Sequence, residues 1–366
     1  MISLFDTTTI NGMTLANRFV RSATYEGMAN DDLTVSQRLI HLMLALAKGG
    51  IGLIITGLAT VTKDGQNMPW QIGIHSDDFI PGLTQMTEAV HDVGGKIVIQ
   101  LAHGGAQGDS ELTGELLGPS VIPAVSGEGA ACRAMTMADI HRVVEAFGEA
   151  GRRAKQAGFD GVQLHGAHGF LLSEFLSPFF NKRTDQYGGS LANRARIVLD
   201  AYRRVRDAVG TSYPVMIKLN SEDFLEEGLT LEEMLQVASW LETEGIDAIE
   251  VSGGTSWAIW RGNYNASYAR VEKTDLYYRE AARRYKDAIQ VPLMLVGGIR
   301  SFDVAKQIVE SGLTDYIAMC RPLIREPDLV NRWKSGDTRP SVCVSDNACV
   351  GPLGEGKGLI CVHLKK

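Results

Sequence analysis

The chain has 366 residues, of which 45% are hydrophobic and 22% charged, and its formal net charge at pH 7 is −7. This length supports one large α/β domain or two smaller ones. The negative charge argues against nucleic acid or an anionic membrane as a partner, and no apolar run is long enough to cross a bilayer. The N-terminal sequence MISLFDTTTING has none of the features of a signal peptide, so we expect a cytoplasmic protein.

Short apolar runs rich in β-branched residues recur along the chain. Before the first of them, Asn11-Gly12 lies between alternating residues and predicts a hairpin. Many of the runs are apolar at nearly every position of their first half, which is typical of parallel strands covered on both faces. We predict strands at 19–23, 51–57, 96–102, 161–167, 215–220, 248–254, 293–299 and 316–322.

Amphipathic segments between these runs predict helices. Residues 137–159 repeat apolar side chains at helical spacing, 229–245 ends on a glycine suited to a C-cap, and 301–312 begins with a serine suited to an N-cap. Eight strand–helix alternations predict an α/β fold, a (β/α)₈ TIM barrel over residues 1–335, followed by a cysteine-containing tail at 336–366. We interpret 103–137 as a loop excursion on the barrel rim.

A doubly wound open sheet is the rival fold. It is disfavoured because no G-x-G-x-x-G follows the first strand, and because polar residues and glycines follow nearly all eight runs. In a barrel those positions share one rim, where active sites are built.

The predicted rim carries groups suited to a phosphate. Gly297 and Gly298 precede a helix start, and Arg321 follows the last strand, as in the phosphate sites of many barrels. The alternative is that the glycines form a tight turn and the arginine lies on the surface.

The remaining strand ends are polar rather than acidic. A metal-dependent hydrolase would require carboxylates beside the His165/His168 pair, whereas Lys218 would repel a metal ion. Lysine, histidines and Gln100 instead suit a flat, hydrogen-bonding, electron-accepting cofactor.

Five stretches support a more specific interpretation: NRFVRSATYEG, IVIQLAHGGAQ, GVQLHGAHGFLLSEFLSPFFNKRTDQYGGSLANRAR, VGGIR and CRPLIREP. In this order, over about residues 3–335, they resemble the motifs of the old yellow enzyme family of FMN-dependent NAD(P)H:flavin oxidoreductases. Within this family the chain resembles bacterial ene reductases and the barrel domain of the 2,4-dienoyl-CoA reductase group. The resemblance implies FMN as cofactor and NAD(P)H as electron donor. It implies FMN contacts from Ala23, Thr24, Gly57, Gln100, His165, Lys218, Ser252, Gly253, Gly297, Gly298, Cys320 and Arg321.

By the same resemblance, His165 and His168 hydrogen-bond the carbonyl oxygen of a substrate above the flavin. Two donors aimed at one oxygen polarise an α,β-unsaturated carbonyl and stabilise the developing enolate. The alternative for two such histidines is a hydrogen-bonded structural role in the core.

One departure from the family concerns the proton donor. Many members have tyrosine two residues after the second histidine, and here Phe170 has no proton to donate. We take Tyr25 as the substitute catalytic residue, with Tyr264 and Tyr268 as alternatives. The alternative is that these tyrosines only line the pocket. In that case water would be the proton source.

A second departure lies in the tail, CVSDNACVGPLGEGKGLIC. It is similar to the segment that binds a [4Fe–4S] centre in the dienoyl-CoA reductase group, but Asp346 replaces a cysteine and the spacing before Cys349 is one residue short. Iron–sulfur clusters are normally held by four thiolates. Although Cys343, Cys349 and Cys361 remain as candidate ligands, we expect a remnant that binds neither cluster nor metal.

The sequence therefore predicts a flavoenzyme that takes hydride from NAD(P)H and reduces an activated C=C bond of an enone or enoyl thioester by a ping-pong mechanism. Two alternatives stay open: a metal- or phosphate-handling barrel hydrolase or isomerase, and a flavin-binding protein without ene-reductase activity. We expect a small unsaturated carbonyl compound as the substrate and a homo-oligomer as the assembly.

Overall fold

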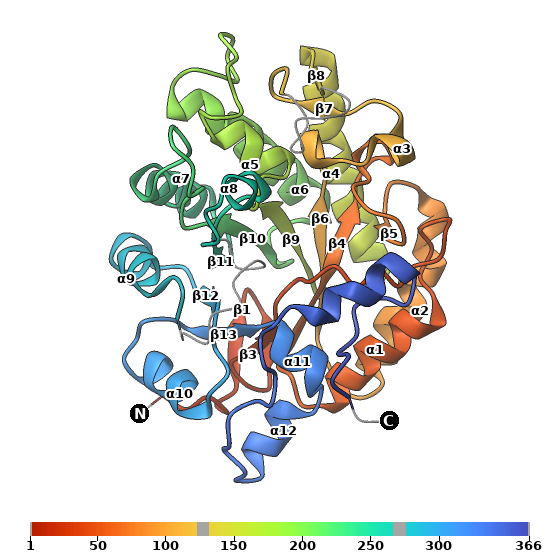
Figure 1. Ribbon diagram of the computed structural model, residues 1–366, viewed down its shortest axis with the longest axis vertical. Coiled ribbons are helices and arrows are strands. Elements are labelled where there is room, and N and C mark those ends of the chain that lie inside the picture. Colours follow the sequence, from red (N-terminus) through yellow and green to blue (C-terminus); the bar gives the residue numbers. More distant parts are fainter. Residues whose placement is uncertain (1, 123–131, 266–275, 365–366) are drawn as a thin grey trace.

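The predicted parallel barrel is present in the computed structural model, which describes residues 2–122, 132–265 and 276–364 (Figure 1). Neighbouring barrel strands pair in parallel, and β13 pairs with β3 to close the ring. The eight strands are β3 (Phe19–Arg21), β4 (Leu53–Thr60), β6 (Ile97–Ala102), β9 (Gly161–Gly166), β10 (Val215–Asn220), β11 (Ala248–Ser252), β12 (Leu293–Val296) and β13 (Tyr316–Met319). A short strand, β5 (Ile72–Gly73), pairs with the end of β4.

The predicted N-terminal hairpin is confirmed and fills the amino-terminal end of the barrel. Strands β1 (Thr8–Ile10) and β2 (Met13–Leu15) are antiparallel, and Asn11 and Gly12 have φ of +40° and +79° in the turn. Apolar side chains of the hairpin pack against inward-facing residues near the starts of the barrel strands. This inner cluster contains Ile10, Met13, Leu15, Val20, Leu53, Val98, Met216, Ala248, Met294 and Tyr316, among others.

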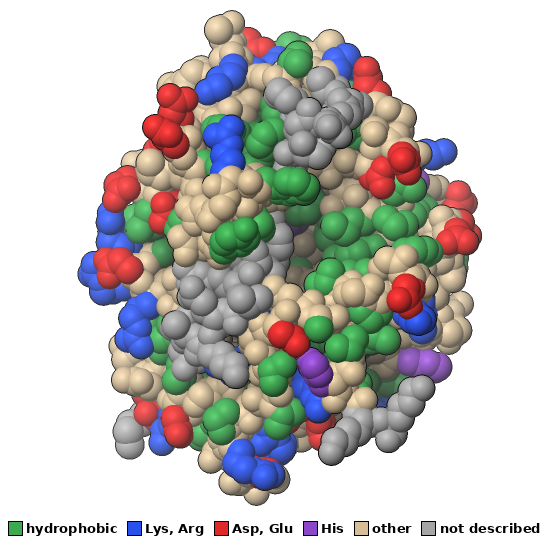
Figure 2. Space-filling view, viewed as in Figure 1, with side chains coloured by type: hydrophobic (Ala, Val, Ile, Leu, Met, Phe, Trp, Pro, Cys, Tyr) green, Lys and Arg blue, Asp and Glu red, His purple; other side chains and the backbone are tan. Residues whose placement is uncertain are grey.

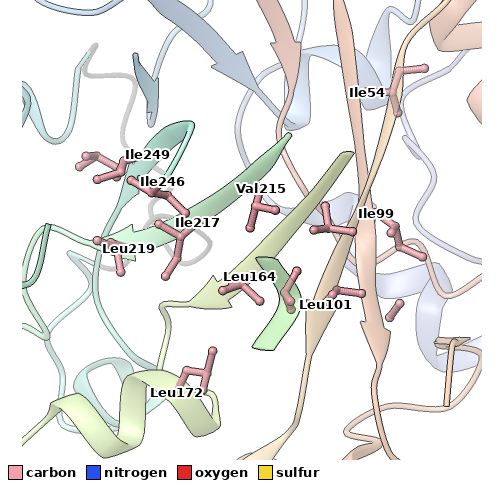
Figure 3. Close-up of a cluster of buried hydrophobic side chains, with 14 of the residues drawn as sticks. Ile54, Ile99, Leu101, Leu164, Leu172, Val215, Ile217, Leu219, Ile246 and Ile249 are labelled. Carbon is pink, nitrogen blue, oxygen red and sulfur yellow. The ribbon is translucent and has the colours of Figure 1, made fainter. Parts of the chain in front are cut away.

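A larger apolar cluster lies between the strands and the surrounding helices. Figure 3 shows part of it, in which Ile99, Leu164 and Ile217 come from successive strands. The longer helices are α1 (Gln37–Lys48), α2 (Ile80–His91), α4 (Met137–Gln156), α6 (Leu191–Val209), α7 (Leu231–Glu244), α9 (Arg279–Ala288) and α10 (Phe302–Glu310). None of the described helices is long and apolar enough to span a membrane.

The helix ends follow the predicted capping chemistry in part. Helix α7 begins with a capping box formed by Thr230 and Glu233 and ends at Gly245, which has φ of +93° as a left-handed C-cap requires. Ser301 is the N-cap residue of α10, but the prediction of a serine cap is wrong in one respect, because its side chain makes no hydrogen bond to the helix.

The long connection after β6 contains short elements of its own. They are the 3₁₀ turn η3 (Gly105–Gln107), α3 (Ser110–Thr113), and the two-residue strands β7 (Leu117–Gly118) and β8 (Arg133–Ala134), which pair with each other. Helix α5 (Leu171–Leu176) follows β9 and packs against η3 and β7. The connection therefore builds up the rim at the carboxyl end of the barrel.

The C-terminal segment returns to this rim. After α11 (Arg321–Arg325) and α12 (Leu329–Lys334), the chain forms the 3₁₀ helix η4 (Ala348–Glu355), drawn in dark blue in Figure 1. Arg38 on α1 donates from Nη1 to the Gly356 carbonyl at 2.7 Å, and the Leu359 amide donates to the Glu26 carbonyl at 2.7 Å. The tail is thus fixed to α1 and to the segment between β3 and α1.

Candidate active site

A cavity of about 420 Å³ lies at the carboxyl ends of the barrel strands. This volume is in the range of small-molecule and cofactor sites, 300–1,000 Å³. Figure 2 shows a hollow near the centre of one face of the molecule, with hydrophobic side chains along one side of it. Of the residues predicted as site residues, the cavity is lined by Ala23, Thr24, Tyr25, Gln100, His165, His168, Lys218, Ser252, Gly297, Gly298, Cys320 and Arg321, together with Cys349 of the tail.

Two predicted flavin contacts, Gly57 and Gly253, are not among the lining residues. The Gly57 amide donates to Glu26 Oε1 at 2.8 Å, and the Gly253 carbonyl accepts from Tyr278 at 3.2 Å. Their backbone groups are therefore engaged with the protein itself.

The polar floor of the cavity is anchored by a buried ion pair that the sequence analysis did not identify. Lys218 Nζ lies 3.3 Å from Glu250 Oε1 and 2.8 Å from Ser22 Oγ. Glu250 is fully buried, and Lys218 is 2% exposed. From the sequence, Lys218 was predicted only to repel a metal ion and to suit a flavin, and the structure places a counter-charge directly beside it.

A chain of amides connects this pair to Gln100. Gln163 Nε2 donates to Glu250 Oε2 at 2.8 Å, and Gln100 Nε2 donates to Gln163 Oε1 at 2.8 Å. Gln163 lies two residues before His165 on β9 and Glu250 two residues before Ser252 on β11. Since side chains alternate along a strand, this spacing is the signal by which both inward-pointing residues could have been found.

The two histidines lie together at the end of β9, with ring centroids 5.3 Å apart and nearly perpendicular planes. Burial, reinforced by Lys218, lowers the pKa of His168 to about 3, and burial with His168 and Lys218 holds the pKa of His165 well below its ordinary value. Both rings are therefore neutral at pH 7, and each carries one N–H.

The buried Nδ1 of His165 makes no hydrogen bond with any described residue. Leaving a buried polar atom unsatisfied costs about 1–3 kcal/mol. Because His165 lines the cavity, a bound ligand is the natural partner for this ring.

His168 is held from three sides. Its amide donates to Asn220 Oδ1 at 3.1 Å, its carbonyl accepts from Gln107 Nε2 at 3.0 Å, and its Nε2 lies 2.7 Å from Ser252 Oγ. The residue has φ of +64°, an uncommon conformation that these contacts maintain. Ser252, predicted as an FMN contact, is thus also a partner of His168.

The residues predicted to form a phosphate cradle line the same cavity, next to residues of the tail. Gly297 and Gly298 have φ of +121° and +79°, conformations that favour glycine. Arg321 donates to the Ser345 carbonyl at 3.2 Å and to Asn347 Oδ1 at 2.8 Å. Ser345, Asn347, Cys349, Val350, Leu353 and Leu359 of the tail line the cavity as well, which no local sequence pattern indicates.

The three tyrosines considered as proton donors differ in their position relative to the cavity. Tyr25 lines the cavity, but its hydroxyl donates to the Pro69 carbonyl, and burial together with Glu26 raises the pKa of Tyr25 to about 12. Tyr264 is 63% exposed and does not line the cavity. Tyr268 lies outside the described residues. The Phe170 ring is 4.6 Å from that of His165, so the position of the usual tyrosine does face the site.

The tail cysteines surround a second, much smaller space. Cys343, Cys349 and Cys361 line about 20 Å³, room for roughly one water molecule. Asp346 is hydrogen-bonded to His363 at 2.6 Å, and no disulfide is formed. Within the described ranges, no group of three or more His, Cys, Asp or Glu has the geometry of a metal site. Whether this segment binds a cluster stays a prediction.

Comparison with known proteins identifies the family of the chain. The model of the NADH:flavin oxidoreductase / NADH oxidase family matches residues 3–339 of the chain. The chain belongs to this family. It is therefore a flavin oxidoreductase of the old yellow enzyme type, which confirms the family, the barrel and the enzyme class predicted from sequence.

Several relatives support this assignment. The chain is 36% identical over 356 residues to an NADH oxidase of Thermoanaerobacter brockii, covering 95% of this chain and 54% of the relative. It is 35% identical over 329 residues to an NADPH dehydrogenase of Geobacillus sp. (strain WCH70), covering 88% and 91% respectively. A 2-naphthoyl-CoA reductase in complex with 2-naphthoyl-CoA superimposes with a TM-score of 0.88 at 28% identity, over 95% of this chain and 54% of the other. The chain thus spans about half the length of two of these proteins.

The family implies FMN as the cofactor and NAD(P)H as the electron donor, and the residues present fit such a group. The cavity has the volume of a cofactor site, Lys218 and Gln100 lie on its polar floor, and glycines precede the start of α10. His165 offers a buried ring atom that a ligand would satisfy.

Proposed function

We propose that this chain is an ene reductase that reduces the activated C=C bond of an α,β-unsaturated carbonyl compound. Bound FMN would supply the hydride chemistry, taking hydride from NAD(P)H and passing it to the β-carbon of the substrate. The observation that carries the proposal is the pair of neutral histidines, His165 buried and His168 partly buried, that line the same cavity as Lys218 and Gln100.

The floor and one side of the cavity would hold FMN. Gln100 and Lys218 suit the polar edge of the flavin ring, and Ala23 and Thr24 border the same region. The amides near Gly297 and Gly298, with the Arg321 guanidinium, suit the phosphate.

The histidines would bind and polarise the substrate. A neutral imidazole N–H that points at the carbonyl oxygen stabilises the negative charge that develops there during hydride addition. Removal of one such donor typically costs 10²–10³-fold in rate. Asn220 and Gln107 fix the backbone of His168 and Ser252 contacts its ring, so little reorganisation is needed.

For the proton that reaches the α-carbon, we propose water as the source. Phe170 has no proton to give, and the hydroxyl hydrogen of Tyr25 is directed to the Pro69 carbonyl. Substitution Tyr25→Phe is therefore expected to leave the rate of alkene reduction within about threefold of wild type. A loss of 10²-fold or more, the usual effect of removing a general acid, would return Tyr25 to the role predicted from the sequence.

The substrate class is an enone or an enoyl thioester. The 2-naphthoyl-CoA reductase to which the chain is similar was solved with a thioester, which supports including thioesters in the test. Both compounds present a carbonyl oxygen for His165 and His168 and an electrophilic β-carbon.

The test is an anaerobic titration of the FMN-loaded protein. The flavin spectrum should bleach with NADH or NADPH and return on addition of cyclohexenone or crotonyl-CoA. Histidine variants His165→Ala and His168→Ala should bleach normally but return at least 10²-fold more slowly. Recovery with oxygen alone would favour a flavin oxidoreductase without ene-reductase activity, and a chain that takes up no FMN would overturn the proposal.

A further inference from the structure

The residue that the proposed mechanism leaves unused is Glu250. It is a fully buried carboxylate at the centre of the barrel, and it is not among the residues that line the cavity. Its two oxygens are both engaged: Oε1 accepts from Ser22 Oγ at 2.5 Å and lies 3.3 Å from Lys218 Nζ, while Oε2 accepts from Gln163.

The ion pair between Lys218 and Glu250 is oriented relative to the cavity. Lys218 lines the cavity and Glu250 lies behind it, so the positive end of the pair faces the ligand. With both groups out of water, their charges are weakly screened. A ligand that acquires negative charge in the cavity would be attracted by the lysine and, less strongly, repelled by the carboxylate.

The carboxylate also orients the amide chain. An ionised carboxylate can only accept hydrogen bonds, so Gln163 must turn its NH₂ group toward Glu250. The Gln163 oxygen then points to Gln100, whose NH₂ group donates to it. The Gln100 oxygen is thereby left for the cavity, where it can accept from a ligand N–H such as that of a flavin pyrimidine ring.

From this arrangement we propose that Glu250 is a positioning residue that sets the redox potential of FMN in this site. It balances the charge of Lys218 and fixes the orientation of Gln100. The inference rests on the proposed function only in requiring that the cavity binds FMN. Reduction places negative charge on the flavin ring, so an unbalanced Lys218 stabilises the reduced form more than the oxidised form.

The decisive experiment measures the two-electron midpoint potential of FMN in wild type and Glu250→Gln at pH about 6 and about 8. The substitution removes the negative charge and keeps the size of the side chain. We expect reduced FMN to bind at least tenfold more tightly relative to oxidised FMN, a rise of about 30 mV. The matched control is Glu174→Gln, another fully buried glutamate, which bonds to the Ala106 amide instead of Lys218 and should leave the potential unchanged.

A second variant separates charge from orientation. Gln163→Leu breaks the amide chain without changing any charge. It should weaken oxidised and reduced FMN equally, as measured by fluorescence titration, with no change in potential. If Glu250→Gln does not fold, Glu250→Asp, which lengthens the ion pair, should shift the potential in the same direction by a smaller amount.

Equal potentials in FMN-loaded wild type and Glu250→Gln at both pH values would overturn this inference and leave the proposed function intact. A rise in the Glu174→Gln control as large as that in Glu250→Gln would also overturn it. Failure of wild type to take up FMN would instead remove the proposed function, and this inference with it.

Discussion

The buried histidine of the rim, His103, gives a quantitative test of the structure. It follows β6, is completely buried, accepts from the Gly105 amide at 3.1 Å through Nδ1, and its carbonyl accepts from the Leu171 amide. Burial lowers its pKa to about 4, against 6.5 for a free histidine, although Asp64 acts in the opposite direction.

The sign of the effect follows from proton uptake. Below pH 6.5 the unfolded chain binds a proton at this histidine, whereas the folded chain does not until about pH 4. Its contribution to the free energy of unfolding is therefore complete above pH 6.5 and is lost as the pH falls toward 4. At pH about 5, some 1.5 units below the unfolded pKa, the loss is about 2 kcal/mol at about 1.4 kcal/mol per unit.

The measurement compares wild type with His103→Asn by urea denaturation at pH about 8 and about 5. Asparagine keeps an acceptor for the Gly105 amide and does not titrate. Between the two pH values, wild type should lose about 2 kcal/mol more than the variant. His141→Asn, at an exposed position on α4, is the control and should lose as much as wild type. Equal losses in wild type and His103→Asn would refute the reasoning that this ring is buried and neutral.

Three further predictions follow from the site and the tail. Phe170→Tyr places a hydroxyl beside His165 and should accelerate reduction of weakly activated enones by about 10²-fold in stopped-flow assays, whereas an unchanged rate would mean that protonation does not limit turnover. Lys218→Met leaves Glu250 buried and unpaired, and should lower the free energy of unfolding, measured by urea denaturation, by about 3–5 kcal/mol. The double variant with Glu250→Gln should regain part of this loss. A loss below about 1 kcal/mol would contradict the buried pair. Arg38→Ala removes the bond to Gly356 and should speed tryptic cleavage of the tail, while unchanged cleavage would show that other contacts hold it.

Much of the barrel follows from local patterns. Apolar strand runs, the Asn11-Gly12 turn and the glycine at 245 each specify a local conformation, and the structure contains all of them. The histidine pair, Lys218 and Gln100 were found for the same reason, because they lie in or shortly after strands whose order the barrel fixes.

What the sequence did not reveal depends on contacts between distant residues. Gly57 is engaged by Glu26, and Lys218 by Glu250, because the barrel brings separate strands together. The inward-pointing position of Glu250 could have been predicted from its two-residue spacing from Ser252. Its ion pair with Lys218 could not, because the two residues lie on different strands. The return of the tail over the cavity depends on contacts such as that of Leu359 with Glu26, for which no periodic signal exists.

The hairpin at the amino-terminal end has a kinetic consequence. Because Ile10, Met13 and Leu15 fill that end of the barrel, they close it beneath the main cavity, which lies as a well at the carboxyl ends of the strands. If, as proposed, a nicotinamide and an unsaturated carbonyl compound both react in this well, we expect them to occupy it in turn, each excluding the other while it is bound. A high concentration of either reactant should therefore inhibit the reaction of the other. This competition follows from the closed end of the barrel.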